Sequence, residues 1–189
     1  MTSTNIPANP AKPSTPFERA EALASWAEAQ AAVVPRIAED PRGSNDGPPM
    51  RLYSLQGEQP LAWCARFVRT GLLLVGALPG FRPFDLYQMA SASAMYRHLV
   101  GVRNAIPVAE AQAKRGDLRF YTAPGDGANP ETIHHVGIIV GVDLAERQFD
   151  VVDGNWSDAV ERRMAPWDGV AERNALHLRL GPLDDEVTP

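Results

Sequence analysis

The side chains best suited to chemistry in this sequence are its only cysteine, Cys64, and two adjacent histidines, His134 and His135. Cys64 follows a polar, turn-rich segment and stands in the first turn of a run with helical spacing. There, the unpaired amide N–H groups and the positive end of the helix dipole favour the thiolate, the nucleophilic form of cysteine. A lone cysteine on an apolar helix is also a common buried hydrophobe, so a catalytic role requires a base elsewhere in the chain.

The strand predicted over residues 133–142 supplies the candidate base. Because side chains alternate between the two faces of a strand, His135 shares a face with Gly137 and Gly141, whereas His134 lies on the other face. The two glycines leave their face open to another element, and we expect the helix that carries the thiol to approach it there. His135 is therefore the predicted general base, and His134 is expected to be packed or solvent-facing.

A third polar group comes from residues 149–156 (FDVVDGNW). In extended structure Asp153 and Asn155 fall on one face, where either side chain can accept the imidazole N–H and fix the tautomer of His135. The run Asp-Gly-Asn is also strong turn chemistry, which is the structural alternative. Together with the thiol and the imidazole, these residues form the nucleophile, base and orienting group of a cysteine hydrolase.

The elements that must position these groups are helices first and strands afterwards. Thr15, Pro16 and Glu18 predict the N-cap, first residue and capping box of a helix that stops at Pro35. A loop over residues 36–59, with a short helical turn near Leu52 and Tyr53, leads to the cysteine helix. The remaining predictions are a helix over residues 86–99 and strands over residues 118–122, 133–142, 149–152, 159–164 and 175–180.

This order predicts an α+β domain over residues 16–189, with N-terminal helices packed on an antiparallel sheet of about five to six strands. Prolines at every third position predict a disordered leader over residues 1–15. On the cysteine helix, Phe67, Val68 and Leu72 form the predicted buried stripe, with Arg66 and Arg69 nearer solvent.

Composition excludes several classes of protein. The net charge is −5 and the basic residues are scattered, so neither nucleic acid nor an anionic membrane surface is an expected partner. No apolar stretch approaches the roughly 20 residues of a membrane-spanning helix, so no membrane insertion is expected. The first 16 residues lack the basic and apolar regions of a Sec signal peptide.

Four segments of the chain resemble the CHAP family of cysteine amidases and peptidases, a papain-like group within the NlpC/P60 class that cleaves peptidoglycan. The resemblance covers roughly residues 38–164, and the matching segments are 63–68 (WCARFV), 116–121 (GDLRFY), 135–139 (HVGII) and 153–155 (DGN). It implies a papain-like α+β fold with Cys64 as nucleophile and His135 as base. Many relatives carry glutamate where Asp153 stands, so the sequence leaves open whether Asp153 or Asn155 orients the imidazole.

The resemblance implies a peptidoglycan hydrolase that cleaves an amide bond, either as an N-acetylmuramoyl-L-alanine amidase or as an endopeptidase of the stem peptide or cross-bridge. No metal or other cofactor is expected, because the adjacent His134 and His135 point to opposite faces and cannot readily share an ion with Asp153. The candidate substrate-binding residues are aromatic: Trp63, Tyr121 and Trp156. For Trp63, packing in the core is an equal alternative.

By analogy with phage lysins and antibacterial effector toxins of contractile secretion systems, we expect action on the cell wall or in the periplasm, after phage lysis or non-Sec export. For an effector, a cognate immunity protein is the expected partner. Two other functions are compatible with the same residues. One is a non-catalytic structural or binding protein that retains the fold, and the other is a cysteine protease or deamidase that acts on protein.

Overall fold

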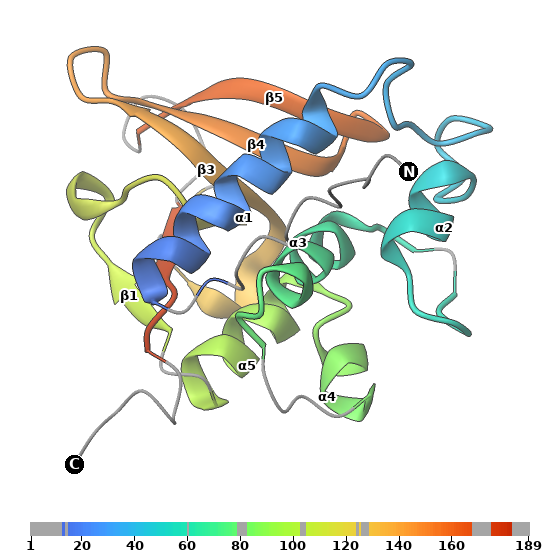
Figure 1. The fold of residues 1–189 in the computed structure, drawn as a ribbon, viewed down its shortest axis with the longest axis horizontal. Helices are drawn as coiled ribbons and strands as arrows, with labels where there is room; N and C mark the ends of the chain where they lie inside the picture. The colour runs from blue at the N-terminus through green and yellow to red at the C-terminus, as the bar shows by residue number, and fades with distance from the viewer. Residues whose placement is uncertain are drawn as a thin grey trace, which may run out of the picture.

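A six-stranded antiparallel sheet with helices packed against it forms the framework of the molecule, which confirms the predicted α+β class (Figure 1). The computed structural model describes residues 13, 15–59, 61–78, 83–102, 105–123, 125, 129–167 and 175–182. Nearly all of the predicted leader, residues 1–15, lies outside these ranges.

The described helices are α1 (Pro16–Ala31), α2 (Pro48–Tyr53), α3 (Cys64–Leu74), α4 (Pro83–Gln88) and α5 (Ala92–Val102), with 3₁₀ turns η1 (Glu110–Gln112) and η2 (Pro130–Thr132). The strands are β1 (Ile106–Val108), β2 (Leu118–Thr122), β3 (Ile133–Asp143), β4 (Gln148–Trp156), β5 (Ala159–Pro166) and β6 (Ala175–Arg179). Their spatial order is β1-β6-β2-β3-β4-β5, so β3 and β4 pair as neighbours near one end of the sheet.

Helix α1 begins with the predicted capping box, since Thr15 Oγ1 accepts from the Glu18 N–H and Glu18 Oε2 accepts from the Thr15 N–H. The helix ends at Ala31 rather than at Pro35. The residue before a proline is disfavoured in helical backbone, and Val34 is 92% exposed, so no packing holds the last predicted turn in place.

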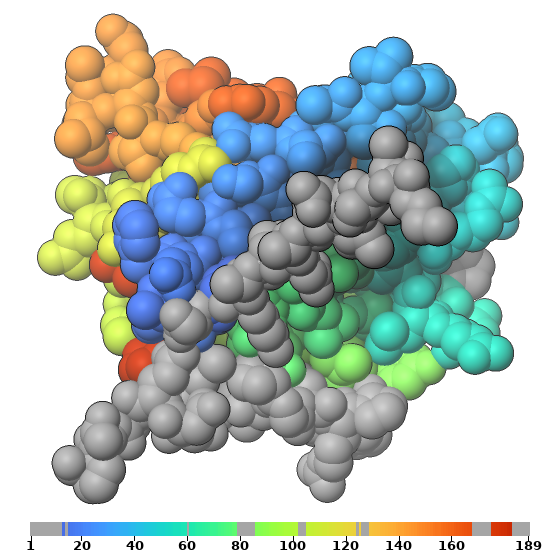
Figure 2. Space-filling model, viewed as in Figure 1, coloured from blue at the N-terminus to red at the C-terminus, as the bar shows by residue number. Residues whose placement is uncertain are grey.

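The helices cover one face of the sheet. Helix α1 packs on β3, β4 and β5, α3 packs on β3 and β4, and α5 packs on β3. In Figure 2, α1 crosses the near face of the molecule as a blue band above the green helices. The main core lies between these layers and joins strand residues such as Val136 and Ile138 to helix residues such as Leu23, Phe67 and Leu72. A second, smaller cluster around Ile139, Phe149 and Val151 lies on the opposite face.

Local details depart from the predictions at two places. The helix predicted over residues 86–99 is two helices, α4 and α5, separated by a turn at residues 89–91. Strand β1 was not predicted, because its three residues include Pro107, which is tolerated only where a sheet has an edge. In the part of the chain that the structure describes, none of the helices has the length and apolarity needed to cross a bilayer.

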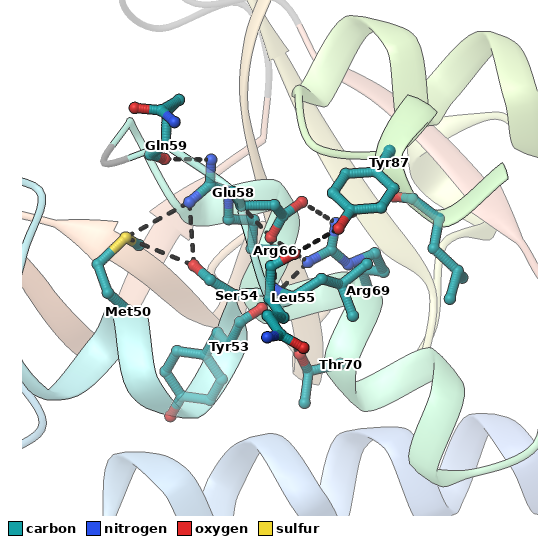
Figure 3. A network of polar contacts seen from close by, with 12 residues as sticks. Met50, Tyr53, Ser54, Leu55, Glu58, Gln59, Arg66, Arg69, Thr70 and Tyr87 are labelled. Carbon is teal, nitrogen blue, oxygen red and sulfur yellow. Dashed lines mark hydrogen bonds and ion pairs between the residues drawn. The ribbon is translucent and has the colours of Figure 1, made fainter. Parts of the chain in front are cut away.

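The prediction that Arg66 and Arg69 of α3 lie nearer solvent is wrong (Figure 3). Their exposed fractions are 2% and 0%, because the loop before α3 folds over them and delivers Glu58. Arg69 donates from both terminal nitrogens to the two carboxylate oxygens of Glu58 at 2.6 and 2.7 Å. Arg66 Nε lies 3.7 Å from Glu58 Oε2, and its terminal nitrogens donate to Ser54 Oγ and to the Gln59 carbonyl.

The Glu58–Arg66–Arg69 cluster fixes α3 from the side away from the sheet. Burial alone would raise the pKa of Glu58, but the hydrogen bonds from Arg69 and the Leu55 N–H, with the two arginine charges, hold it below its usual value of 4.5. The Glu58 carboxylate is therefore ionised at neutral pH and supplies the counter-charge for Arg66 and Arg69. The helix that carries Cys64 is held by core packing on one side and by this ion cluster on the other.

Candidate active site

Cys64 is the first residue of α3, and the first helical hydrogen bond runs from the Phe67 N–H to the Trp63 carbonyl at 2.9 Å. The N–H groups at such a helix start have no intrahelical acceptor and point out of the helix end. Cys64 is a free cysteine that is 5% exposed. The thiol therefore sits at the mouth of a helix N-terminus, as the sequence predicts.

His135 lies near the beginning of β3 and is 8% exposed. Its Nε2 lies 2.9 Å from Asp153 Oδ1 of β4, and its ring lies beside the Cys64 side chain, with which it lines one pocket and which helps to raise its pKa. Because Nε2 is engaged by Asp153, Nδ1 is the nitrogen left for the thiol. The structure thus brings together three of the predicted catalytic side chains, with the imidazole between the thiol and the carboxylate.

Asn155, the other candidate for orienting His135, points elsewhere. The register between β4 and β5 shifts after Asp153, and Asn155 adopts a φ of 59°. This breaks the strict alternation that would have put both side chains on one face. Asn155 Nδ2 instead donates to Asn45 Oδ1 at 3.4 Å. Asp153 is the group in contact with His135, and the segment 153–155 belongs to a strand rather than to a turn.

The prediction that Gly137 and Gly141 leave room for the cysteine helix on the face of His135 is wrong. A Cβ on Gly137 would collide with the Asp153 carboxylate, and one on Gly141 would meet the Asp150 side chain. The glycine that admits the nucleophile helix is Gly154 of β4, where a Cβ would collide with Phe67 of α3. Helix α3 therefore packs on the sheet face opposite to His135, and its first residue reaches the imidazole where β3 begins and β4 ends.

A pocket of about 460 Å³ opens over the thiol and the imidazole. Of the three aromatic residues predicted to bind substrate, Trp156 lines it. Trp63 does not, because it is fully buried in the core and donates from Nε1 to Glu39 Oε1 at 2.8 Å, and Tyr121 is only 3% exposed and packs behind the imidazole at a ring distance of 5.5 Å. The lining residues are Ala62, Cys64, His134, His135, Asn155, Trp156 and Ser157.

Sequence reasoning missed Arg163 of β5, whose Nε donates to Asp153 Oδ2 at 2.7 Å. The available signal was the pair Arg162 and Arg163 in a predicted strand, since one of two adjacent side chains must point to the face that carries Asp153. The register between the strands, which the sequence does not contain, decides which arginine it is.

Burial lowers the pKa of His135, but the hydrogen bonds and charges of Asp153 and Cys64 outweigh that effect and raise it to about 9. The imidazole is therefore cationic near neutral pH, and it lies next to the Cys64 side chain. An imidazolium in this position can protonate a leaving group.

This pKa predicts a pH-dependent stability. The folded protein binds the His135 proton more tightly than the unfolded chain, so the stabilisation is full below about pH 6.5 and is lost as the pH rises through about 9. Its size is on the order of 3 kcal/mol. The measurement is urea unfolding of the wild type and His135→Asn at several pH values. A difference in unfolding free energy that stays constant from about pH 6 to 9.5 would contradict the assignment.

No family model, no curated protein and no solved structure matches this chain. Among the described residues, His, Cys, Asp and Glu nowhere gather in a group of three or more suited to a metal ion. The site holds a thiol, an imidazole and a buried carboxylate beside an open pocket, and the imidazole lies between the other two groups. This arrangement suits nucleophilic acyl transfer.

Proposed function

We propose that this protein hydrolyses amide bonds through Cys64, that its fold is papain-like and that its substrate is peptidoglycan. The observation that supports the reaction is the contact of His135 with both Cys64 and Asp153. An isolated buried cysteine needs no ionised partner, whereas a nucleophile needs a base that a third group orients. Here the third group has no exposed surface and meets the imidazole at hydrogen-bond distance.

In the proposed reaction, the Cys64 thiolate attacks the carbonyl carbon of the amide and forms a C–S bond. The negative charge moves to the carbonyl oxygen, where the Cys64 N–H at the start of α3 can donate to it. The imidazolium of His135 gives its Nδ1 proton to the amide nitrogen, the C–N bond breaks, and the amine leaves. A thioester remains on Cys64.

Water completes the cycle. Neutral His135 removes a proton from a water molecule, which attacks the thioester carbonyl as the C–S bond breaks. The acid product leaves, and the thiolate and the imidazolium are restored. Throughout, Asp153 accepts from Nε2 and holds the tautomer that presents Nδ1 to the reacting atoms.

The choice of peptidoglycan rests on the resemblance of four segments to peptidoglycan amidases and endopeptidases, and on the shape of the site. The pocket is open and is bordered by Trp156, an aromatic surface on which a sugar ring or an extended peptide can lie. We propose action at the cell wall or in the periplasm, as a lysin or as an antibacterial effector with a cognate immunity protein.

The test is digestion of purified Gram-negative and Gram-positive peptidoglycan, followed by mass spectrometry of the soluble fragments. Since Cys64 is the only cysteine, protein alkylated with iodoacetamide is a control that is blocked at one atom. We expect new fragments from the untreated protein alone, and their masses identify the bond that is cut. If the protein cleaved casein or deamidated glutamine side chains but left both peptidoglycans intact, its substrate would be protein and not peptidoglycan.

A further inference from the structure

We propose that Arg163 is a positioning residue, which holds the Asp153 carboxylate in the orientation that meets His135 and so acts on Cys64 through two intervening side chains. The inference deepens the proposed function and rests on it for its catalytic meaning. Its geometry is independent of the substrate.

The carboxylate of Asp153 is divided between two partners. Oδ1 meets His135 Nε2 at 2.9 Å, and Oδ2 accepts from Arg163 Nε at 2.7 Å. The residue has no exposed surface, so no solvent replaces either partner. A carboxylate held through one oxygen can turn about its terminal torsion, which is broad, whereas a carboxylate held through both cannot. Arg163 thereby fixes the direction in which Oδ1 faces the imidazole.

Arg163 is itself fixed on two further sides. One terminal nitrogen donates to the Tyr121 hydroxyl at 2.7 Å, and the guanidinium carbon lies 3.6 Å from the centre of a Trp156 ring. The strand register explains this reach. Arg163 pairs with Val151 and Glu161 pairs with Asp153, so Arg163 is the diagonal neighbour of Asp153 across β4 and β5.

The same two aromatic residues flank the imidazole. The His135 ring lies 5.5 Å from Tyr121 and 5.3 Å from Trp156, measured between ring centres. Arg163 therefore contacts three side chains that lie against His135: the carboxylate of Asp153, the phenol of Tyr121 and the indole of Trp156. An arginine that only neutralised Asp153 would need only the first of these contacts.

The shape of the arginine matters as well as its charge. A guanidinium is planar and donates in a fork, so it can bind Asp153 and Tyr121 together while stacking on Trp156. A lysine ammonium keeps the charge beside the buried carboxylate but cannot make all three contacts. We therefore expect Arg163→Lys to restore part of what Arg163→Met loses.

The decisive measurement needs no substrate. The rate at which iodoacetamide alkylates Cys64 reports the thiolate that His135 stabilises, and the downfield NMR signal of the proton between His135 Nε2 and Asp153 reports that hydrogen bond. For Arg163→Met we expect an alkylation rate at about pH 6 that is lower by about tenfold, and loss of the NMR signal. We expect kcat to fall by about 100-fold with KM nearly unchanged. Arg163→Lys should recover to within about tenfold of the wild-type kcat.

The chain offers a matched control in the next residue. Arg162 carries the same charge on the same strand and pairs with Asp150 at 2.6 Å, but it points to the face covered by α1, where it also lies 3.3 Å from Glu28. Arg162→Met should leave the alkylation rate and the NMR signal unchanged. Equal losses in Arg162→Met and Arg163→Met would show a general effect of removing charge, and would overturn the proposal.

Wild-type alkylation and NMR signals in folded Arg163→Met would also overturn it. If circular dichroism shows that this variant does not fold, Tyr121→Phe removes one anchor of Arg163 without removing charge. In that variant the rate of Cys64 alkylation should be lower by about threefold or more, and a wild-type rate would overturn the proposal. If alkylation falls as expected while the wild-type protein cleaves no amide in any substrate, the positioning role stands and the proposed function fails.

Discussion

Cys64→Ala is expected to lower kcat for amide hydrolysis by about 10⁵-fold and to leave the folded structure intact. The residual rate comes from binding and from the donors at the start of α3. The residue is 5% exposed and loses a single heavy atom, so the free energy of unfolding should change by about 1 kcal/mol.

The measurements are the rate of peptidoglycan fragment release and urea unfolding of the same samples. Thr70→Ala is a matched control on α3, since its hydroxyl donates to the Tyr53 carbonyl at 3.4 Å, away from the pocket. It should keep wild-type activity. A Cys64→Ala protein that retained a tenth of the wild-type rate would rule out the thiol as nucleophile. Equal function of the wild type and Cys64→Ala would favour a non-catalytic binding protein.

Glu58→Gln is expected to destabilise the protein by about 3–5 kcal/mol. The substitution keeps the shape of the side chain but removes the only carboxylate that faces Arg66 and Arg69 in their described surroundings. Both guanidinium groups are then buried next to one another without a counter-charge. Because the pKa of Glu58 is lowered on folding, this stabilisation is present above about pH 4.5 and is lost as the pH falls further.

Urea unfolding at neutral pH checks this effect. Glu161→Gln is the control, because Glu161 makes an equally short contact of 2.6 Å with Arg36, but both side chains are partly exposed to solvent. Exposed pairs contribute about 0–1 kcal/mol. If the two variants lost the same small amount of stability, the buried cluster would not be what anchors α3.

The sequence predicts those parts of the fold whose signals are local. The capping box at Thr15 and the strands after residue 118 follow from capping chemistry and from alternation, which act over a few residues. The contact between His135 and Asp153 was predictable because the two strands are consecutive and antiparallel, although Asn155 could not be set aside without knowing the register shift.

The errors share one physical cause, which is that they depend on contacts between distant segments. Arg66 and Arg69 stand where a solvent-facing arginine would, and only the fold of the preceding loop shows that Glu58 covers them. The pattern of β3 shows two faces but does not say which face the helices occupy. The sequence therefore predicts that α3 approaches at Gly137, whereas the structure places that approach at Gly154. Arg163 depended on the register of β4 and β5.

The rim of the pocket is built differently from its floor. At the floor, Cys64 and His135 are buried and are held by α3 and by the sheet, whereas Ala62 and Ser157 at the rim are exposed and Asn155 is half-buried. Asn155 and Ser157 have positive φ values, a backbone state that asparagine, aspartate and glycine adopt more readily than bulky residues. If the proposed reaction holds, exchanging a few small polar residues at the rim should change which bond fits the pocket and leave the groups proposed to break it in place.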